Sequence, residues 1–243
     1  MHQRLRVGPD CRHHQSVRPA PCLLAQPAGC PIRKAISHLR ALDPGGRSEI
    51  IAVDGDPAGS TINAIIDAGV RVLTAEKGRG RQMNRGAALA KGAILLFLHA
   101  DTFLPPGAFP LILAAMSDRR IVAGAFDLGL DSDRRIFRLT ERYVLLRTRL
   151  TRIPFGDQAI FIRKDYFDRI GGYRKISLME DVDLMKRIRK RGDRIRIIPA
   201  RVRTSPRRYD REGILYGTFR NWLLQILYAL GVPPDRLAQW YRS

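Results

Sequence analysis

The chain has 243 residues, of which 45% are hydrophobic, and it carries a formal net charge of +20. A chain of this length is long enough to bury a full hydrophobic core, and it can form one large domain or two small ones. The hydrophobic fraction is ordinary for a globular protein. The charge favours an acidic partner, which can be nucleic acid, an anionic membrane or a phosphorylated small molecule.

The N-terminal residues 1–31 show no hydrophobic period. They contain four prolines before Pro31 together with scattered arginines, and the apolar run Cys22–Ala25 is too short for the core of a signal peptide. We therefore expect this segment to be disordered and the folded domain to span residues 32–243. Within that domain, residues 212–243 are expected to form an apolar helical segment.

All three cysteines of the chain, Cys11, Cys22 and Cys30, fall in this N-terminal segment. Their spacing matches no structural zinc pattern, and no paired Cys-x-x-Cys occurs. A cysteine-free domain suits a reducing cytosol.

The first part of the domain alternates helices and strands. Apolar residues at helical spacing predict a helix at Ile32–Leu42, and the run Glu49–Asp54 predicts a buried strand that ends in an aspartate. After a turn-rich loop, we predict a helix at Thr61–Ala68 and a strand at Val70–Thr74. This alternation predicts an α/β fold with a largely parallel sheet.

A basic, glycine-punctuated stretch at Lys77–Gly92 then runs into a helix. Lys77, Arg79 and Arg81 lie at its start, and a helix N-terminus also favours anions. The stretch is not a Walker A loop, because the Gly-Lys-Ser/Thr ending is missing. A solvated basic helix start is the alternative interpretation.

The run Ala93–Asp101 reads Ala-Ile-Leu-Leu-Phe-Leu-His-Ala-Asp and predicts a strand buried on both faces. Ligands of open α/β sheets bind outside the carboxyl ends of the strands. This end carries His99 and Asp101, two groups that can ligate a divalent cation. The alternative is that Asp101 only caps the following turn.

The second half of the chain has a mixed pattern. Its predicted elements are helices at Leu111–Met116, Arg134–Leu150, Tyr166–Ile170 and Met179–Arg191, a loop and strand at Phe155–Ile162, strands at Ile121–Leu130 and Ile195–Ile198, and an apolar helix at Ile214–Leu230. We expect Pro199 to end the strand before it. Glu180 and Asp181 lie in the first turn of their helix, where carboxylates suit the helix dipole.

Five short motifs in this order carry a family resemblance: Val-Asp-Gly, Arg-Gln-Met-Asn, Leu-His-Ala-Asp, Gly-Asp-Gln and Met-Glu-Asp. With them the chain resembles the family 2 glycosyltransferases, from about Ile32 to the C-terminus, and in particular a bacterial subgroup. The resemblance implies the GT-A fold: a mostly parallel sheet with flanking helices, made of a Rossmann-like nucleotide-binding half and a mixed acceptor half.

The resemblance also implies roles for individual residues in the transfer of a sugar from a nucleotide-diphosphate sugar. Asp181 resembles the catalytic base, and Asp101 resembles a ligand of the divalent cation, Mg²⁺ or Mn²⁺, with His99 in place of the usual first aspartate. The donor is expected at Asp54, Gly55, Arg79, Arg81 and Asn84, and the acceptor side at Gly156, Asp157, Gln158 and Glu180. Inversion at the sugar is implied by the same likeness.

One departure from the family lies at the N-terminus. The family begins with an apolar strand and a Pro-x-x-Asn-Glu turn around the nucleotide base, and we find neither in residues 1–31. Either part of the nucleotide site has been lost, or the reading frame upstream of about Ile32 is not the ancestral one. The abrupt break between unpatterned and well-patterned sequence favours the second alternative, and under either one we expect the chain to be weakly active or inactive.

Two other classes of protein stay open at this point. A nucleic-acid-binding protein would explain the charge, since eleven Lys or Arg stand against two acids between positions 187 and 211. Against it, aromatic residues for base stacking are absent from 187–208. A nucleotidyltransferase would use a similar sheet, cation and basic loop, but it would not need the late Glu180-Asp181 helix. We expect no nucleic-acid partner.

Location is the last expectation. The most apolar late segment, Trp222–Pro233, is about twelve residues long, which is short of the ~20 residues that cross a bilayer. Arg134–Leu150 and Glu212–Leu230 combine apolar faces with arginine and aromatic edges, as interfacial helices do. We expect a cytoplasmic protein at the inner face of an anionic membrane. The alternative is that both segments are ordinary core helices.

Overall fold

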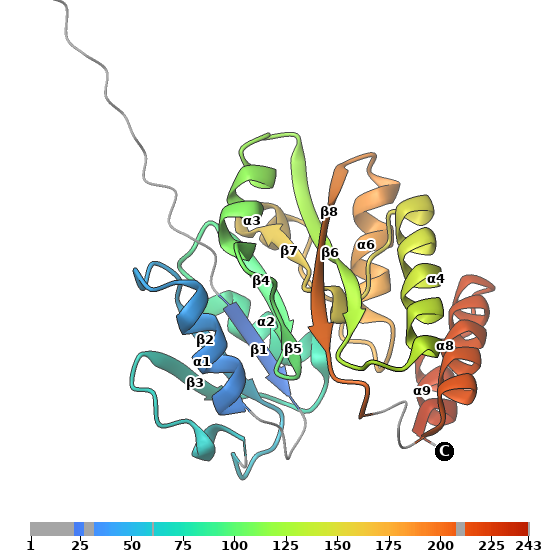
Figure 1. Cartoon of the computed structure of the whole chain (residues 1–243), viewed down its shortest axis with the longest axis horizontal. Coiled ribbons are helices and arrows are strands. Elements are labelled where there is room, and N and C mark those ends of the chain that lie inside the picture. Colours follow the sequence, from blue (N-terminus) through green and yellow to red (C-terminus); the bar gives the residue numbers. More distant parts are fainter. Residues whose placement is uncertain (1–21, 27–31, 60, 208–211, 243) are drawn as a thin grey trace, which may run out of the picture.

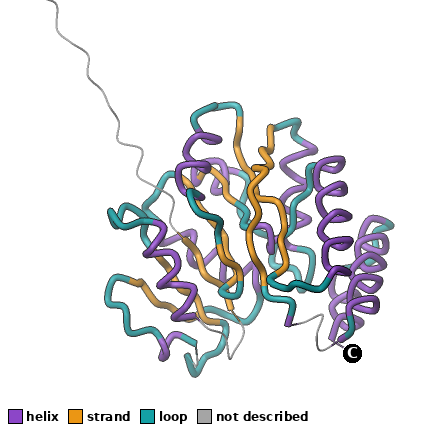
Figure 2. Tube along the Cα trace, in the orientation of Figure 1, coloured by secondary structure: helices purple, strands orange, loops and turns teal. Residues whose placement is uncertain are grey.

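The computed structural model describes residues 22–26, 32–59, 61–207 and 212–242. The strands form one eight-stranded sheet in the order β3-β2-β1-β4-β7-β6-β8-β5, with helices on both sides (Figures 1 and 2). The strands are β1 (Cys22–Gln26), β2 (Ile50–Asp54), β3 (Val70–Thr74), β4 (Ile94–His99), β5 (Thr102–Phe103), β6 (Ile121–Leu130), β7 (Phe161–Arg163) and β8 (Arg194–Thr204).

The helices match the helical periodicity of the sequence in most places. They are α1 (Ile32–Leu42), α2 (Arg79–Leu89), α3 (Ala108–Met116), α4 (Arg135–Thr151), α5 (Lys164–Arg169), α6 (Glu180–Lys190), α8 (Ile214–Ala229) and α9 (Pro234–Arg242), with short 3-10 turns η1 (Ile62–Ala64) and η2 (Gly156–Gln158). No helix in the described ranges has both the length and the apolarity to cross a membrane.

The central strands are buried on both faces, which explains their unbroken apolar runs. In β4, Leu96 packs into the cluster formed by α1 and α3, while its neighbours Leu95 and Phe97 pack into the cluster formed by α2 and α6. Successive side chains of a strand point to opposite faces, so a strand covered by helices on both sides needs apolar residues at every position. The predicted α/β class with flanking helices is confirmed.

The prediction that residues 1–31 contain no strand is wrong for Cys22–Gln26. This segment forms β1, which lies between β2 and β4 and pairs with both in parallel. The family's first strand is therefore present, and the expectation of a chain lacking it does not hold. Residues 1–21 and 27–31 are outside the part of the chain that the structure describes. The structure therefore does not test the expectation that the turn after the first strand is missing.

Two further expectations are corrected. Between Thr61 and Ala68 the chain forms only the short turn η1, and no helix. Strand β8 continues past Pro199 to Thr204, because the pairing with β6 shifts register between Ile198 and Arg201. Proline has no N–H to donate to a neighbouring strand, and the irregularity at this point accommodates it without ending the strand.

The order of the first four strands indicates where a ligand-binding crevice lies. Strands β3, β2, β1 and β4 are all parallel, and the order reverses direction between β1 and β4. Ala25 pairs with His99 and Gln26 pairs with Asp54, so β1 ends level with both neighbours. Open α/β sheets bind ligands at the carboxyl ends of the strands beside such a reversal.

Candidate active site

The N-terminus of α2 packs directly against the start of α6. A Cβ atom on Gly80 would lie 2.9 Å from the carbonyl oxygen of Arg174 and 3.5 Å from Cβ of Glu180. Only a glycine allows the two segments to approach this closely. The glycine therefore brings Arg79, the first residue of α2, to the acidic first turn of α6.

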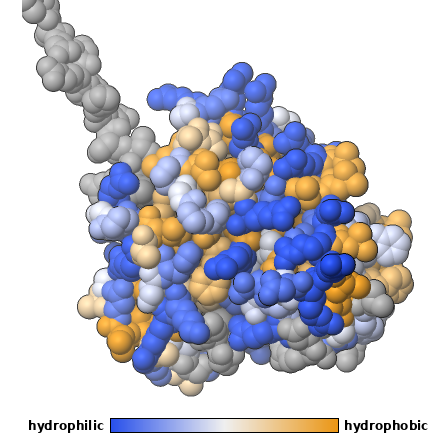
Figure 3. All heavy atoms as spheres, viewed as in Figure 1, coloured by the Kyte–Doolittle hydropathy of each residue, from blue (hydrophilic) through white to orange (hydrophobic). Residues whose placement is uncertain are grey.

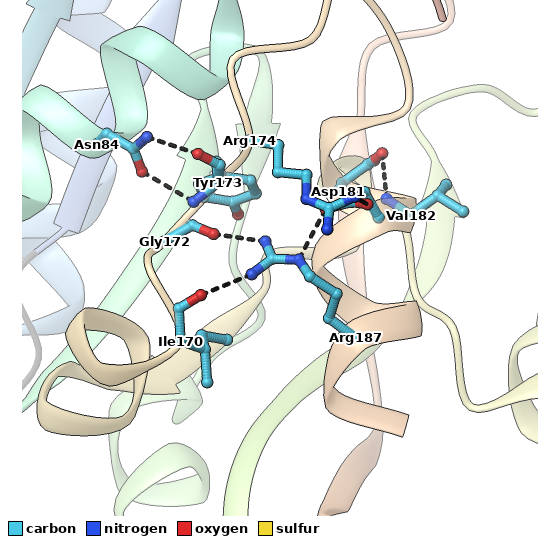
Figure 4. A network of polar contacts seen from close by, with 9 residues as sticks. Asn84, Ile170, Gly172, Tyr173, Arg174, Asp181, Val182 and Arg187 are labelled. Atoms are coloured by element: carbon cyan, nitrogen blue, oxygen red, sulfur yellow. Dashed lines mark hydrogen bonds and ion pairs between the residues drawn. The ribbon is translucent and has the colours of Figure 1, made fainter. Parts of the chain in front are cut away.

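A polar clamp holds the loop that leads into α6 (Figure 4). The side-chain amide of Asn84 donates to the carbonyl oxygen of Tyr173 at 2.8 Å and accepts the N–H of Tyr173 at 2.9 Å. The guanidinium of Arg187 donates to the carbonyl oxygens of Ile170 and Gly172 and to the carboxylate of Asp183. These contacts tie α2, the loop and α6 together.

The carboxylate of Asp181 lies at the centre of the site. Its Oδ2 accepts the N–H of Gly156 at 2.6 Å, and its Oδ1 accepts the N–H of Val182 at 2.7 Å. A Cβ on Gly156 would lie 2.9 Å from Nε2 of His99 and 3.3 Å from Oδ2 of Asp181, so the imidazole and the carboxylate both border this glycine. The structure thus brings together three predicted site residues from β4, η2 and α6.

Electrostatics link this centre to Arg79. Burial, together with the charge of Arg79, lowers the pKa of His99 to about 3, so the imidazole is neutral near neutral pH. Arg79 is exposed to solvent. Partial desolvation alone would lower its pKa, but the charges of Glu180, Asp181 and Asp157 outweigh that effect and raise the pKa. Arg79 is therefore one of the cations that compensate the acids of the site.

Two more acids surround Asp181, and both have raised pKa values. Burial raises the pKa of Asp157 to about 6, helped by the charge of Asp181 and opposed by Arg147 and Arg79. Burial and the charge of Asp181 also raise the pKa of Glu180. Such clustering of perturbed acids at the end of a sheet is typical of a functional site.

Two residues that the sequence did not single out belong to this region. The ring of Tyr173 is buried, and its hydroxyl has no hydrogen-bond partner among the described residues. Arg147, on the inner side of α4, stacks its guanidinium on Phe155 at 3.6 Å and donates to the side chain of Gln158 at 3.3 Å. The only sequence signal for Tyr173 is its position after Gly171-Gly172, and Arg147 resembles any other arginine of its helix.

Asp101 lies in the turn after β4. Its carboxylate pairs with Arg207 at 3.6 Å, and its carbonyl oxygen accepts the N–H of Ser205. Within the described residues no three His, Cys, Asp or Glu side chains come close enough to hold a metal ion. One carboxylate and a neutral imidazole suit a cation that takes its other ligands from the phosphates of a substrate, as Mg²⁺ commonly does.

Asp54 and Gly55 lie at the carboxyl end of β2. The carboxylate of Asp54 is buried and accepts the N–H groups of Asp56, Thr61 and Ile62, so it holds the following loop in place. Gly55 lies against the side chain of Gln82, which is 3.0 Å from where a Cβ would stand.

Three predicted site residues have other contacts than expected. Arg81 is exposed and pairs with Glu76 at 3.4 Å, on the loop before α2. Asn84 uses its amide in the clamp on Tyr173. Gln158 is fully buried; its side-chain NH2 donates to the carbonyl oxygen of Phe126 and its side-chain oxygen accepts the N–H of Phe155, so it supports the η2 turn from within.

The fold and this site define the class of the protein. The crystal structure of GalNAc-T7 with UDP, GalNAc and Mn²⁺ is similar, with a TM-score of 0.56 at 14% sequence identity, over 79% of this chain and 44% of that one. The chain thus spans less than half of that protein, and the likeness shows the fold, which is the GT-A glycosyltransferase fold.

The family follows from the sequence. The model of glycosyl transferase family 2 matches residues 28–179, which is more than half of the chain. The chain therefore belongs to glycosyl transferase family 2, a family of enzymes, and the predicted resemblance is confirmed. No curated protein matches the chain.

Proposed function

We propose that the enzyme transfers a sugar from a nucleotide-diphosphate sugar to an acceptor hydroxyl, with Asp181 as the general base. The observation that carries the proposal is the position of the Asp181 carboxylate, bordered by Gly156 and His99 and facing the charge of Arg79. A carboxylate within hydrogen-bond reach of the acceptor can take its proton as the new bond forms.

The donor would lie across the ends of β2, β1 and β4. Asp54 and Gly55 lie at the carboxyl end of β2, and Arg79 is the first residue of α2. Arginine and a helix N-terminus both suit a diphosphate. The structure of GalNAc-T7 contains UDP and Mn²⁺, which supports a nucleotide diphosphate and a divalent cation as ligands here.

Asp101 would hold the divalent cation, Mg²⁺ or Mn²⁺, with His99 as a second ligand or a neighbour. When bound, such a cation neutralises the charge of the departing diphosphate. His99 is neutral near neutral pH, as a metal-ligating imidazole must be.

The chemistry is a direct displacement. The acceptor oxygen forms a bond to the anomeric carbon while its proton passes to Asp181, and the bond from that carbon to the diphosphate breaks with its electron pair leaving on the diphosphate oxygen. Attack from the face opposite the leaving group inverts the anomeric configuration. Gly156 and Asp157 would border the acceptor, with Gln158 and Glu180 behind them.

The family membership favours this function over a nucleotidyltransferase or a nucleic-acid-binding protein. We place the enzyme in the cytoplasm at the inner face of the membrane, because anionic lipids of the cytoplasmic leaflet attract basic surfaces and the chain carries a net charge of +20. Membership of the bacterial subgroup belongs to the same proposal.

A panel of nucleotide sugars tests the proposal. Thermal shift of the full chain, with and without Mn²⁺, should show stabilisation by one nucleotide sugar and a larger shift when the cation is present. The anomeric configuration of the product, read by NMR, then tests inversion. Stabilisation by polyanions alone, with no preference among sugars, would reject the donor and favour the nucleic-acid interpretation.

A further inference from the structure

The outer face of α4 carries a stripe of exposed apolar side chains. The stripe consists of Ile136, Leu139, Tyr143, Leu146 and Leu150, spaced alternately by three and four residues. Residues at this spacing lie along one side of a helix. Leu139, Leu146 and Leu150 are 68%, 61% and 72% exposed, so the stripe faces solvent and does not pack on the core.

Helix α8, next to α4, repeats the arrangement. Tyr216, Phe219 and Leu223 are exposed at spacings of three and four residues, with Trp222 beside them. Leu230, seven residues after Leu223 and just past the end of α8, is exposed as well. The two helices are in contact, since Arg147 donates to Gln225 at 3.4 Å. In Figure 3, apolar side chains gather along the side of the molecule where α4, α8 and α9 lie. We call these two stripes together the α4–α8 face.

Arginines border the apolar stripe of α4. At about 100° per residue, they fall on one flank of it, next to the apolar side chains. They are Arg135, Arg138, Arg142 and Arg149. Arg138 pairs with Glu141 and Arg149 pairs with Asp127. Arg135 and Arg142 are exposed and have no ion-pair partner among the described residues.

We propose that the α4–α8 face docks in the plane of an anionic lipid membrane. Helices that lie on a membrane place apolar and aromatic side chains in the acyl boundary and basic side chains at the headgroups. The leucines and the rings of Phe219 and Trp222 provide the first set, and the arginines of α4 provide the second. The α4 helix, 17 residues long, would lie along the surface over about 25 Å.

Charge favours an anionic membrane over a second copy of this chain or a nucleic acid as the partner of the α4–α8 face. In a symmetric dimer through this face, the arginines of two copies would meet like charges, which opposes association. A nucleic acid would engage the arginines but would leave the leucines in water. An anionic bilayer satisfies both groups at once. The inference deepens the membrane location proposed above by naming the surface that makes the contact, and it does not depend on the proposed sugar transfer.

Co-sedimentation of the full chain with vesicles tests the proposal. Vesicles of phosphatidylcholine mixed with phosphatidylglycerol should bind the protein at low salt, and vesicles of phosphatidylcholine alone should bind it far less. Leu139→Gln with Leu146→Gln should weaken binding at least ten-fold. Arg135→Gln with Arg142→Gln should weaken it about twenty-five-fold, since each basic residue contributes roughly a factor of five at an anionic surface.

Matched controls come from elsewhere on the surface. Ile66 is 80% exposed in the loop after η1, and Arg119 is exposed in the turn between α3 and β6. Ile66→Gln and Arg119→Gln should bind vesicles as the wild type does. All six substituted residues are exposed, so thermal unfolding should confirm that each variant folds.

Tryptophan fluorescence provides a second readout, because Trp222 lies on the α4–α8 face. In a Trp240→Phe variant, the emission of Trp222 should shift to the blue when anionic vesicles are added, because the indole leaves water. Absence of vesicle binding, equal losses in the control variants, or an unshifted Trp222 would overturn the proposal. A dimer that the leucine variant abolishes, or RNA binding that replaces vesicle binding, would assign the face to those partners instead.

Discussion

The N–H of Gly156 donates to Oδ2 of Asp181 at 2.6 Å, joining two segments that are 25 residues apart in the chain. With the N–H of Val182 on Oδ1, both oxygens of the carboxylate accept a backbone donor. The carboxylate is thereby held in one orientation, and Gly156 is the residue that leaves room for it and for His99. A carboxylate held in this way is already ordered before any ligand binds, which suits the role of general base that we propose for it.

Replacing Asp181 with asparagine tests the base directly. Asp181→Asn keeps the shape of the side chain but removes its negative charge, and its one amide oxygen can accept only one of the two N–H groups, from Gly156 or from Val182. We expect nucleotide-sugar binding to stay near normal and transfer to fall by about 10²–10⁴. Steady-state rates and donor titration measure both quantities. Asp165→Asn, in the exposed first turn of α5, is the control; an equal loss of donor binding in Asp181→Asn would leave Asp181 a structural residue.

Replacing Asp101 tests the cation. Asp101→Asn removes the charge that would hold Mg²⁺ or Mn²⁺, so donor binding should lose its dependence on the cation. Titration of Mn²⁺ at a fixed donor concentration measures this. Asp131→Asn, an exposed acid paired with Arg203, should behave as the wild type. Undiminished transfer by the wild type in excess EDTA would assign the diphosphate to the arginines alone.

Replacing Asn84 distinguishes a role in positioning the loop before α6 from a role in binding the donor. Its amide holds Tyr173, so Asn84→Ala should lower kcat and reduce the free energy of unfolding by about 1–3 kcal/mol while the donor Kd stays unchanged. Arg187→Lys, which weakens the other half of the clamp, should show the same pattern. A raised donor Kd in Asn84→Ala with unchanged kcat would instead place Asn84 on the nucleotide sugar.

The central position of β1 predicts that it is needed for stability. Leu24→Pro removes an N–H from a strand that pairs on both sides, and each lost or unsatisfied ladder contact costs about 1–3 kcal/mol. Urea unfolding followed by circular dichroism should show a markedly lower midpoint. Unchanged stability of this variant would mean that the domain does not need the pairing.

Asp43 predicts a pH dependence of stability. Burial raises the pKa of Asp43, but hydrogen bonds from the hydroxyl and amide of Ser48, both at 2.6 Å, outweigh it, so the pKa lies below its ordinary value of 3.8. A lowered folded pKa stabilises the protein above that value, and the contribution is lost as the pH falls through the folded pKa.

Asp43→Asn should therefore cost about 1 kcal/mol near neutral pH. The difference from the wild type should shrink as the pH falls below 3.8, because the wild-type carboxyl then becomes protonated as well. Urea unfolding near neutral pH and again below pH 3.8 measures this difference in the free energy of unfolding. Asp133→Asn, at an exposed position, is the control. A difference that stays constant with pH would contradict the charged hydrogen bond.

Local sequence pattern alone was enough to predict many of the strands and helices of this protein. The unbroken apolar runs of β2 and β4 predict buried strands, and the residues at their ends, Asp54 and His99, follow from the rule that ligands meet the carboxyl ends of strands. The periodic apolar residues of α1 and the first-turn acids of α6 are equally local. Such features depend on neighbours within a few residues, so a sequence displays them.

Other features exist only because distant segments meet. Cys22–Gln26 is too short and too lacking in period to predict a strand, and it becomes β1 because β2 and β4 supply hydrogen-bond partners on both sides. The strand β8 continues through Pro199 because its pairing with β6 shifts there. The contact between Gly156 and Asp181 and the raised pKa of Asp157 arise in the same way, since hydrogen bonds and burial between segments depend on the folded arrangement and leave no local periodicity in the sequence.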